Sequence, residues 1–224
     1  LPSSTQGTRV STPTARTTPS FKCSSHGQYQ RCIDASACRG KADPAKPFNP
    51  VVNVSWNDAR TFCAWIGGRL PTEAEWEYTA RGGTAGWRYP RGNEIGHDDA
   101  NFAATTNGNL EVKTVGTGPD MARALGLTYP QHGTSQGETF RDNGFSLYDM
   151  AGNVLQWTAD WDGPYPDGPA IDPTGPARGT SRILRGGSWA VTADGLRVSS
   201  RYKIEPASAL DTIGFRCVRD AHTP

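Results

Sequence analysis

Two short helices with clear start and stop signals constrain the fold of this chain more than any other feature. Ser55 is followed three residues later by Asp58, and Thr72 is followed in the same way by Glu75, so each pair can form a capping box at a helix start. A pair of glycines ends each helical pattern, as a left-handed C-cap does. Helices this short do not make a bundle, so the core also needs strands and loops.

The remaining segments predict one more helix and several short strands. Tyr29, Cys32 and Ile33 recur at helical spacing, so we expect residues 26–36 to be helical. Residues 87–144 carry no long periodic pattern and are rich in turn-forming residues. Strands are expected at residues 51–54, 145–148, 154–157, 182–185 and 213–218. This pattern indicates an α+β domain with two main helices, short strands and many long loops.

Charge and hydropathy exclude several classes of partner. The 23 basic and 22 acidic residues nearly cancel, and no basic run is present to bind nucleic acid or an anionic membrane. No apolar run approaches the roughly 18 residues that a membrane helix needs. Residues 1–20 are rich in Ser, Thr and Pro, so we expect a disordered linker that tethers a domain formed by residues 21–224. Because Leu1 is not an initiator Met, we expect further sequence upstream.

The five cysteines leave at least one thiol unpaired within the chain. Cys32 and Cys38 flank a short loop that a disulfide could close. Cys63 lies in an expected helix and Cys217 in the last expected strand, so a bridge between them would tie distant parts of the domain. The alternative is five buried thiols in a cytosolic protein. No Cys-x-x-Cys or Cys/His cluster has metal spacing, so we favour disulfides, an extracellular, cell-surface or periplasmic location, and Cys23 as the leftover thiol.

Two motifs near the C terminus resemble the signature of the formylglycine-generating enzyme family, whose fold is a variant of the C-type lectin fold. They are Arg-Gly-Gly-Ser-Trp at residues 185–189 and Ile-Gly-Phe-Arg-Cys at residues 213–217. The blocks SWNDA…RLPTEAEWE and LYDMAGN extend the match, which runs from about Val51 to Val218. The resemblance implies the same fold. It also implies the Cys63–Cys217 bridge, because the eukaryotic enzyme links the matching helix and strand.

The chain departs from this family where the family's chemistry resides. The resemblance implies two copper-binding cysteines between the two motifs, because Cu(I) prefers soft sulfur ligands. Residues 190–196 read Ala-Val-Thr-Ala-Asp-Gly-Leu and contain no cysteine. We therefore expect neither copper binding nor formylglycine synthesis. The family's opening hairpin is also missing, and Arg91 and Leu155-Gln156 replace residues that are commonly Trp and Trp-Glu.

Calcium is the metal that the resemblance favours. The family builds one loop site from residues that match Asp149, Gly152, Val154 and Gln156, and carboxylate and carbonyl oxygens are the ligands that Ca²⁺ prefers. A neutral amide at Gln156 replaces the usual Glu and should weaken binding. A second site would use Asn101 and the carbonyl of Phe102. In the alternative reading, Asp149 and Asn153 only cap a tight turn.

The segment that forms the active groove in relatives predicts a ligand groove here, with aromatic, charged and small polar side chains. Its predicted members are Trp161, Trp189, Ala190, Val191, Thr192, Asp194, Arg197, Ser199, Arg201, Tyr202 and Lys203. The alternative is that some of these aromatic residues, Trp189 among them, only cover the core.

The sequence is compatible with two functions. The first is a non-catalytic domain that binds a protein, peptide or carbohydrate, in its narrowest form a variable protein diversified by a retroelement between the two C-terminal motifs. The second is an enzyme of the same family with different chemistry, either iron- or copper-dependent oxidation or peptide maturation. The missing cysteine pair favours the first.

Overall fold

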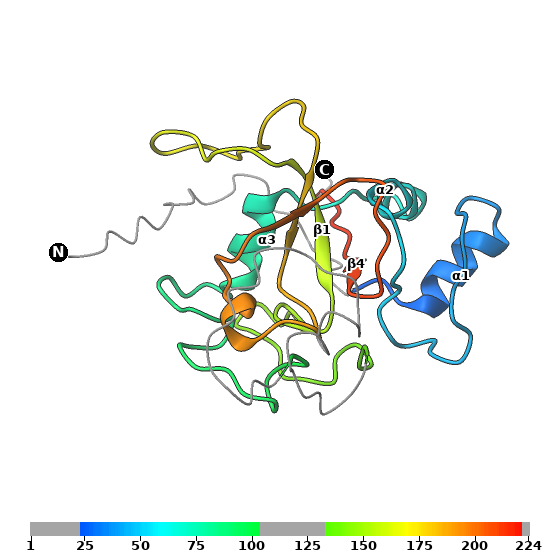
Figure 1. Cartoon of the computed structure of the whole chain (residues 1–224), viewed down its shortest axis with the longest axis horizontal. Helices are drawn as coiled ribbons and strands as arrows, with labels where there is room; N and C mark the ends of the chain where they lie inside the picture. Colours follow the sequence, from blue (N-terminus) through cyan, green and yellow to red (C-terminus); the bar gives the residue numbers. More distant parts are fainter. Residues whose placement is uncertain (1–22, 104–132, 221–224) are drawn as a thin grey trace.

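A small twisted sheet runs through the centre of the molecule (Figure 1). The computed structural model describes residues 23–103 and 133–220, so the predicted linker lies outside the described residues. The sheet order is β3-β2-β1-β4, with β1 parallel to β4 and the other two pairings antiparallel. The strands are β1 (Leu155–Trp161), β2 (Arg182–Arg185), β3 (Tyr202–Ile204) and β4 (Ile213–Phe215).

In the described part of the chain, three short α-helices and one 3₁₀ helix surround this sheet. They are α1 (His26–Asp34), α2 (Trp56–Trp65), α3 (Glu73–Ala80) and the 3₁₀ helix η1 (Ala193–Leu196). Both predicted capping boxes are confirmed, at Ser55 with Asp58 and at Thr72 with Glu75. Figure 1 shows α3 on one side of β1 and α2 on the other, with α1 at the edge of the molecule. The predicted α+β class is confirmed.

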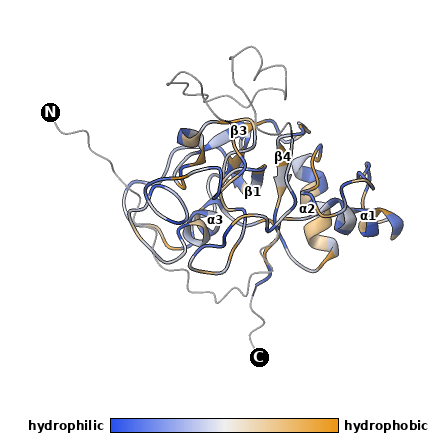
Figure 2. Cartoon of the chain, turned by 90° about the horizontal axis from the view of Figure 1, so that it is seen from below, coloured by the Kyte–Doolittle hydropathy of each residue, from blue (hydrophilic) through white to orange (hydrophobic). Residues whose placement is uncertain are grey.

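The buried stripe of α2 forms the centre of the main hydrophobic cluster. Ala59, Phe62 and Cys63 on this helix are almost fully buried, as their helical spacing predicts. The Phe62 ring lies 5.7 Å from Tyr29 of α1 and 5.4 Å from Phe215 of β4, centroid to centroid. Part of α2 has apolar colouring in Figure 2. Phe62 thus joins both helices to the edge of the sheet.

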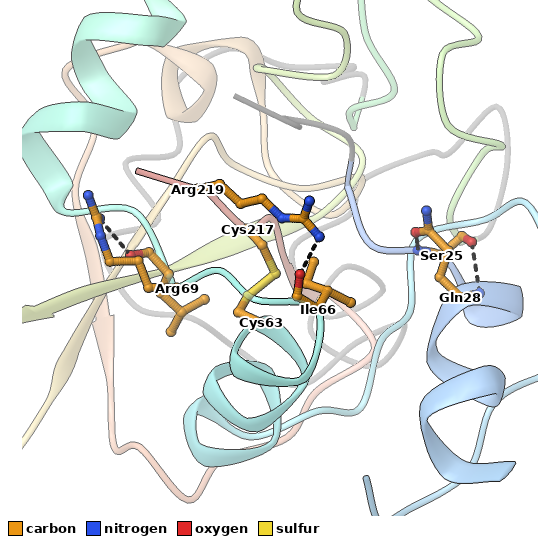
Figure 3. Close-up of a disulfide and its surroundings, with 8 residues drawn as sticks. Ser25, Gln28, Cys63, Ile66, Arg69, Cys217 and Arg219 are labelled. Atoms are coloured by element: carbon orange, nitrogen blue, oxygen red, sulfur yellow. Dashed lines mark hydrogen bonds between the residues drawn. A yellow bond between two sulfur atoms is a disulfide. The ribbon is translucent and has the colours of Figure 1, made fainter. Parts of the chain in front are cut away.

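Two disulfides are formed, and both match the predicted pairs. Cys63 and Cys217 link α2 to the chain that follows β4 across 154 sequence positions, with 5.4 Å between their Cα atoms. Figure 3 shows this bridge beside Arg219, which donates a hydrogen bond to the carbonyl of Ile66 at the end of α2. Cys32 and Cys38 close the short loop after α1. Cys23 keeps a free thiol, as expected.

Two of the expected strands are wrong. Residues 51–54 and 145–148 are not strands, because Asn53 and Ser146 have φ angles of 58° and 57°, which break an extended backbone. The last strand is also shorter than expected, since β4 ends at Phe215 and only single bridges continue beyond it. None of the helices in the described part of the chain has the length and apolar character needed to cross a bilayer.

Candidate ligand-binding surface

The chain turns sharply after β2 and lays residues 188–203 against the core. Gly186 and Gly187 have φ angles of 94° and 70°, in the left-handed region that favours glycine. A Cβ atom on Gly187 would lie 2.5 Å from the side chain of Leu196, so the close approach of η1 also requires glycine. The Gly-Gly pair of the motif therefore fixes where the following segment lies.

Three of the predicted groove residues are buried anchors and do not line a surface. Trp189 is 2% exposed and its indole donates to the carbonyl of Asp211 at 3.2 Å. Tyr202 is 4% exposed and its hydroxyl donates to the carbonyl of Gly195 at 2.9 Å. Val191 packs in a small hydrophobic cluster with Leu196. These three side chains supply the core contacts of this short segment, so they lie beneath the predicted groove, and the groove itself stays a prediction.

The remaining groove residues form an outer face of mixed polarity. Asp194 lies 3.5 Å from Arg88 in an ion pair with both side chains largely exposed, which contributes little to stability. Lys203 lies 2.7 Å from Asp162. We define the outer face as the exposed or half-buried residues Ala190, Thr192, Asp194, Arg197, Ser199 and Lys203.

Trp161 and Arg201 are held by contacts within the protein. The guanidinium of Arg182 lies between two indoles, 3.5 Å from Trp161 and 3.8 Å from Trp56. Arg201 makes a two-pronged ion pair with Glu73, through Nε at 2.6 Å and Nη2 at 2.8 Å. Both side chains are only partly exposed and are held by these contacts, so we leave both out of the outer face.

A buried charge network below this surface was not expected from the sequence. Arg185, the first residue of the Arg-Gly-Gly motif, is fully buried and forms an ion pair with Glu77 of α3. The same guanidinium donates to the carbonyls of Val198 at 2.8 Å and Ser200 at 2.7 Å. Arg185 therefore fastens residues 198–200 to α3 and sets the position of the outer face.

The first predicted calcium loop lies in an Asx-rich turn before β1. Asp149 is 6% exposed; one carboxylate oxygen accepts the amide N–H of Glu138 at 2.8 Å, and the other, Oδ1, is buried without a hydrogen-bond partner. Burial raises the pKa of Asp149 above its usual value. A buried oxygen in this state would accept a cation, so Asp149 fits a calcium site.

Gln156 does not fit a calcium site in this arrangement. Its side-chain oxygen accepts hydrogen bonds from the indole of Trp76 at 2.7 Å and from Arg216. Its amide group donates to the carbonyl of Asp149 at 2.9 Å. The amide of Gln156 is thus used to join β1 to its neighbours.

The structure brings the two predicted calcium segments together. The carbonyl of Asn101 accepts the N–H of Asn153 at 2.8 Å, and a Cβ on Gly152 would lie 2.4 Å from that same oxygen. Asn153 also exchanges two hydrogen bonds with Ser135, which tie the turn to a segment 18 positions earlier. Phe102 is buried and stacks on His97, with 4.2 Å between ring centroids. Among the described residues no three His, Cys, Asp or Glu side chains gather as a metal cluster.

Comparison with known proteins gives one consistent family. The family model described as "Sulfatase-modifying factor enzyme 1-like domain" matches residues 19–221. The chain is 40% identical to the formylglycine-generating enzyme of Streptomyces coelicolor, over 79% of this chain and 54% of that protein. It is 41% identical to the "Inactive C-alpha-formylglycine-generating enzyme 2" of Bos taurus, over 78% of this chain and 52% of that protein. The chain thus spans about half the length of these relatives.

Among solved structures, the fold matches Treponema denticola variable protein 1. The TM-score is 0.67, and the match covers 87% of this chain and 81% of that chain at 24% sequence identity. Likeness at this identity is a likeness of fold. The mixed α+β architecture with few helices and short strands is thus shared across proteins that differ widely in sequence.

Proposed function

This chain belongs to the family of sulfatase-modifying factor enzyme 1-like domains, and we propose that within it the chain is a non-catalytic domain that binds a protein, peptide or carbohydrate through its outer face. The supporting observation is the state of its cysteines. Four of the five form disulfides, and Cys23 alone is free. Copper chemistry of the kind that the resemblance implies needs two neighbouring thiolates. Burial also raises the pKa of the Cys23 thiol, which disfavours its thiolate form.

The outer face suits recognition because its side chains stand on a rigid, buried base. Trp189, Leu196 and Tyr202 are buried under it, and Arg185 fastens its far end to α3. Side chains such as Thr192 and Ser199 can therefore change without disturbing the core. A variable protein diversified between the two C-terminal motifs is the narrower form of this proposal. Disulfides of this kind persist in oxidising compartments, which supports an extracellular, cell-surface or periplasmic location.

The binding proposal is tested with a glycan array and a peptide display library as probes. For a ligand that either selects, Thr192→Arg and Ser199→Arg should each weaken binding at least tenfold, because both place a bulky charge on the outer face. Ala64→Arg, on the exposed side of α2, is the matched control and should bind normally. A selected ligand that binds both outer-face variants as tightly as the parent would show that the contact surface lies elsewhere.

The second candidate, an enzyme of the same family, is favoured by the formylglycine-generating enzymes among the relatives. Its test is the metal content of the purified domain together with turnover of a cysteine-containing sulfatase peptide under copper(I) and oxygen. We expect no formylglycine product. Stoichiometric copper or iron, or any product, would favour the enzyme and contradict the non-catalytic proposal.

We also propose that Asp149, with the carbonyls of Gly152 and Val154, holds calcium weakly. Calcium at about ten times its Kd should stabilise the domain by about 1.4 kcal/mol and raise its Tm. Asp149→Asn should abolish that rise, whereas Asp98→Asn, at an exposed loop carboxylate, should retain it. Calcium-dependent melting curves measure both effects. An equal rise in the Asp149 variant would place any calcium elsewhere.

A further inference from the structure

A small pocket lies between the first turn of α3 and the loop that follows β1. Its volume is about 70 Å³, enough for a few water-sized groups. Ala74 and Tyr165 contribute to its wall, and Glu73, Asp160 and Arg201 lie at its polar end. Four prolines complete the apolar wall: Pro164, Pro166, Pro173 and Pro176. The pocket is separate from the outer face defined above.

Asp160 is the one carboxylate at the polar end of this pocket that is not in an ion pair, among the described residues. Glu73 is paired with Arg201, and Glu77 with Arg185. Asp160 is only 3% exposed, and its Oδ2 accepts the backbone N–H of Glu73 at 2.7 Å. Its Oδ1 accepts no hydrogen bond from any described residue. A carboxylate oxygen that opens on a pocket, on an otherwise buried side chain and without a partner, calls for a positive ligand.

The surroundings of Oδ1 discriminate among cations. A guanidinium prefers two parallel carboxylate oxygens, but Oδ2 is already engaged by Glu73. A divalent metal needs several oxygen ligands, whereas the other carboxylates here are committed to arginines. The face of Tyr165 is covered by Arg201, 4.4 Å from its centroid, so it cannot cage a quaternary ammonium. A primary ammonium needs only one strong acceptor, and proline walls suit the methylene groups that carry it.

We propose that this pocket binds the ammonium end of a lysine side chain or a similar primary alkylamine, with Asp160 as its counter-ion. The ammonium donates to Oδ1, and the methylene stem contacts Ala74 and the prolines.

The test is a titration of the labelled domain at pH 7.5 followed by amide chemical shifts. The probes are N-acetyl-lysine methylamide and n-butylamine, with N-acetyl-(ε-acetyl)lysine methylamide as the uncharged comparison. Shifts should concentrate at Glu73, Gly163 and Gly175, and the acetylated probe should bind at least tenfold more weakly. Tighter binding of the lysine derivative than of butylamine would identify a peptide as the source of the amine. Equal binding would identify free amines as sufficient ligands. Absence of binding by either amine would overturn the proposal.

Two variants and their controls separate the pocket from general effects. Asp160→Asn should weaken amine binding at least tenfold, while Asp162→Asn, two residues further at the surface, should leave it unchanged. Ala74→Leu should fill the pocket and block binding, while Ala64→Leu on the exposed side of α2 should not. If Asp160→Asn and Ala74→Leu bind the amine as the parent does, the site is wrong.

Loss of binding in the Asp160 variant should not come from unfolding. Burial raises the pKa of Asp160 to about 6, because the buried carboxylate is poorly solvated. At pH 7.5 the folded protein carries this unfavourable charge, and asparagine removes it. The variant should therefore melt no lower than the parent at that pH. If it does unfold, the Ala74→Leu result with its Ala64→Leu control decides the proposal alone.

Discussion

Replacing both Cys63 and Cys217 with serine should lower the free energy of unfolding by about 4–5 kcal/mol. The bridge joins positions 154 residues apart, and the entropy that a cross-link removes from the unfolded chain grows with the length of the closed loop. In the folded state it also ties α2 to the chain beyond β4, where Arg69 and Val218 exchange two backbone hydrogen bonds. Denaturant unfolding of the two proteins, each fitted with its own m-value, measures the difference.

The second disulfide supplies the matched control for this prediction. Cys32 and Cys38 are only 6 positions apart, so the chain-entropy model gives a smaller loss of about 2 kcal/mol for the Cys32→Ser, Cys38→Ser variant. The order of the two losses is the critical result. If the short-loop variant lost as much stability as the long-loop variant, loop length would not explain the stabilisation.

Replacing Arg185 with methionine should cost about 3–5 kcal/mol, because it leaves the carboxylate of Glu77 buried with one ion pair fewer. The side chain is fully buried, and its hydrogen bonds to Val198 and Ser200 would be lost as well. We expect the outer face to loosen along with the loss of stability. Chemical denaturation gives the free energy, and amide hydrogen exchange at residues 198–200 gives the local effect.

Arg81 is a control that shares the same partner. It pairs with Glu77 from one turn further along α3, but its side chain is 25% exposed. Arg81→Met should therefore cost about 1 kcal/mol or less, as partly solvated ion pairs do. A second comparison, Arg185→Met combined with Glu77→Gln, should recover part of the loss because it removes the stranded charge. Equal costs for the two arginine variants would contradict the assignment of Arg185 as the buried centre of the network.

The helices could be predicted because their signals are local. In each capping box the two hydrogen bonds join residues three positions apart, so the sequence itself contains both partners. The strand at residues 51–54 is predicted from a run of valines, and valine indicates only a local preference for extended backbone. There the backbone makes single contacts with distant segments, such as the hydrogen bond from Val51 to Ser24, and Asn53 interrupts the extended conformation.

The candidate site was harder to predict because burial is set by distant partners. Trp189 reads as a surface aromatic residue until Asp211 provides its acceptor 22 positions later. Arg185 and Glu77 are 108 positions apart, and neither has a local pattern that indicates the other. Asp160 belongs to no local motif that indicates its place at the pocket. Its Oδ2 is held by the backbone N–H of Glu73, 87 positions away.

The Arg-Gly-Gly-Ser-Trp motif has a consequence for how members of this family are recognised. Its arginine is an internal clamp, its second glycine makes room for η1, and its tryptophan lies under the surface that it precedes. All three roles are structural, and none of them requires a catalytic reaction. A genome survey that counts this motif therefore counts scaffolds, and it groups formylglycine-generating enzymes with relatives that are named inactive. Residues that distinguish those tasks have to be sought in the few positions between the motifs.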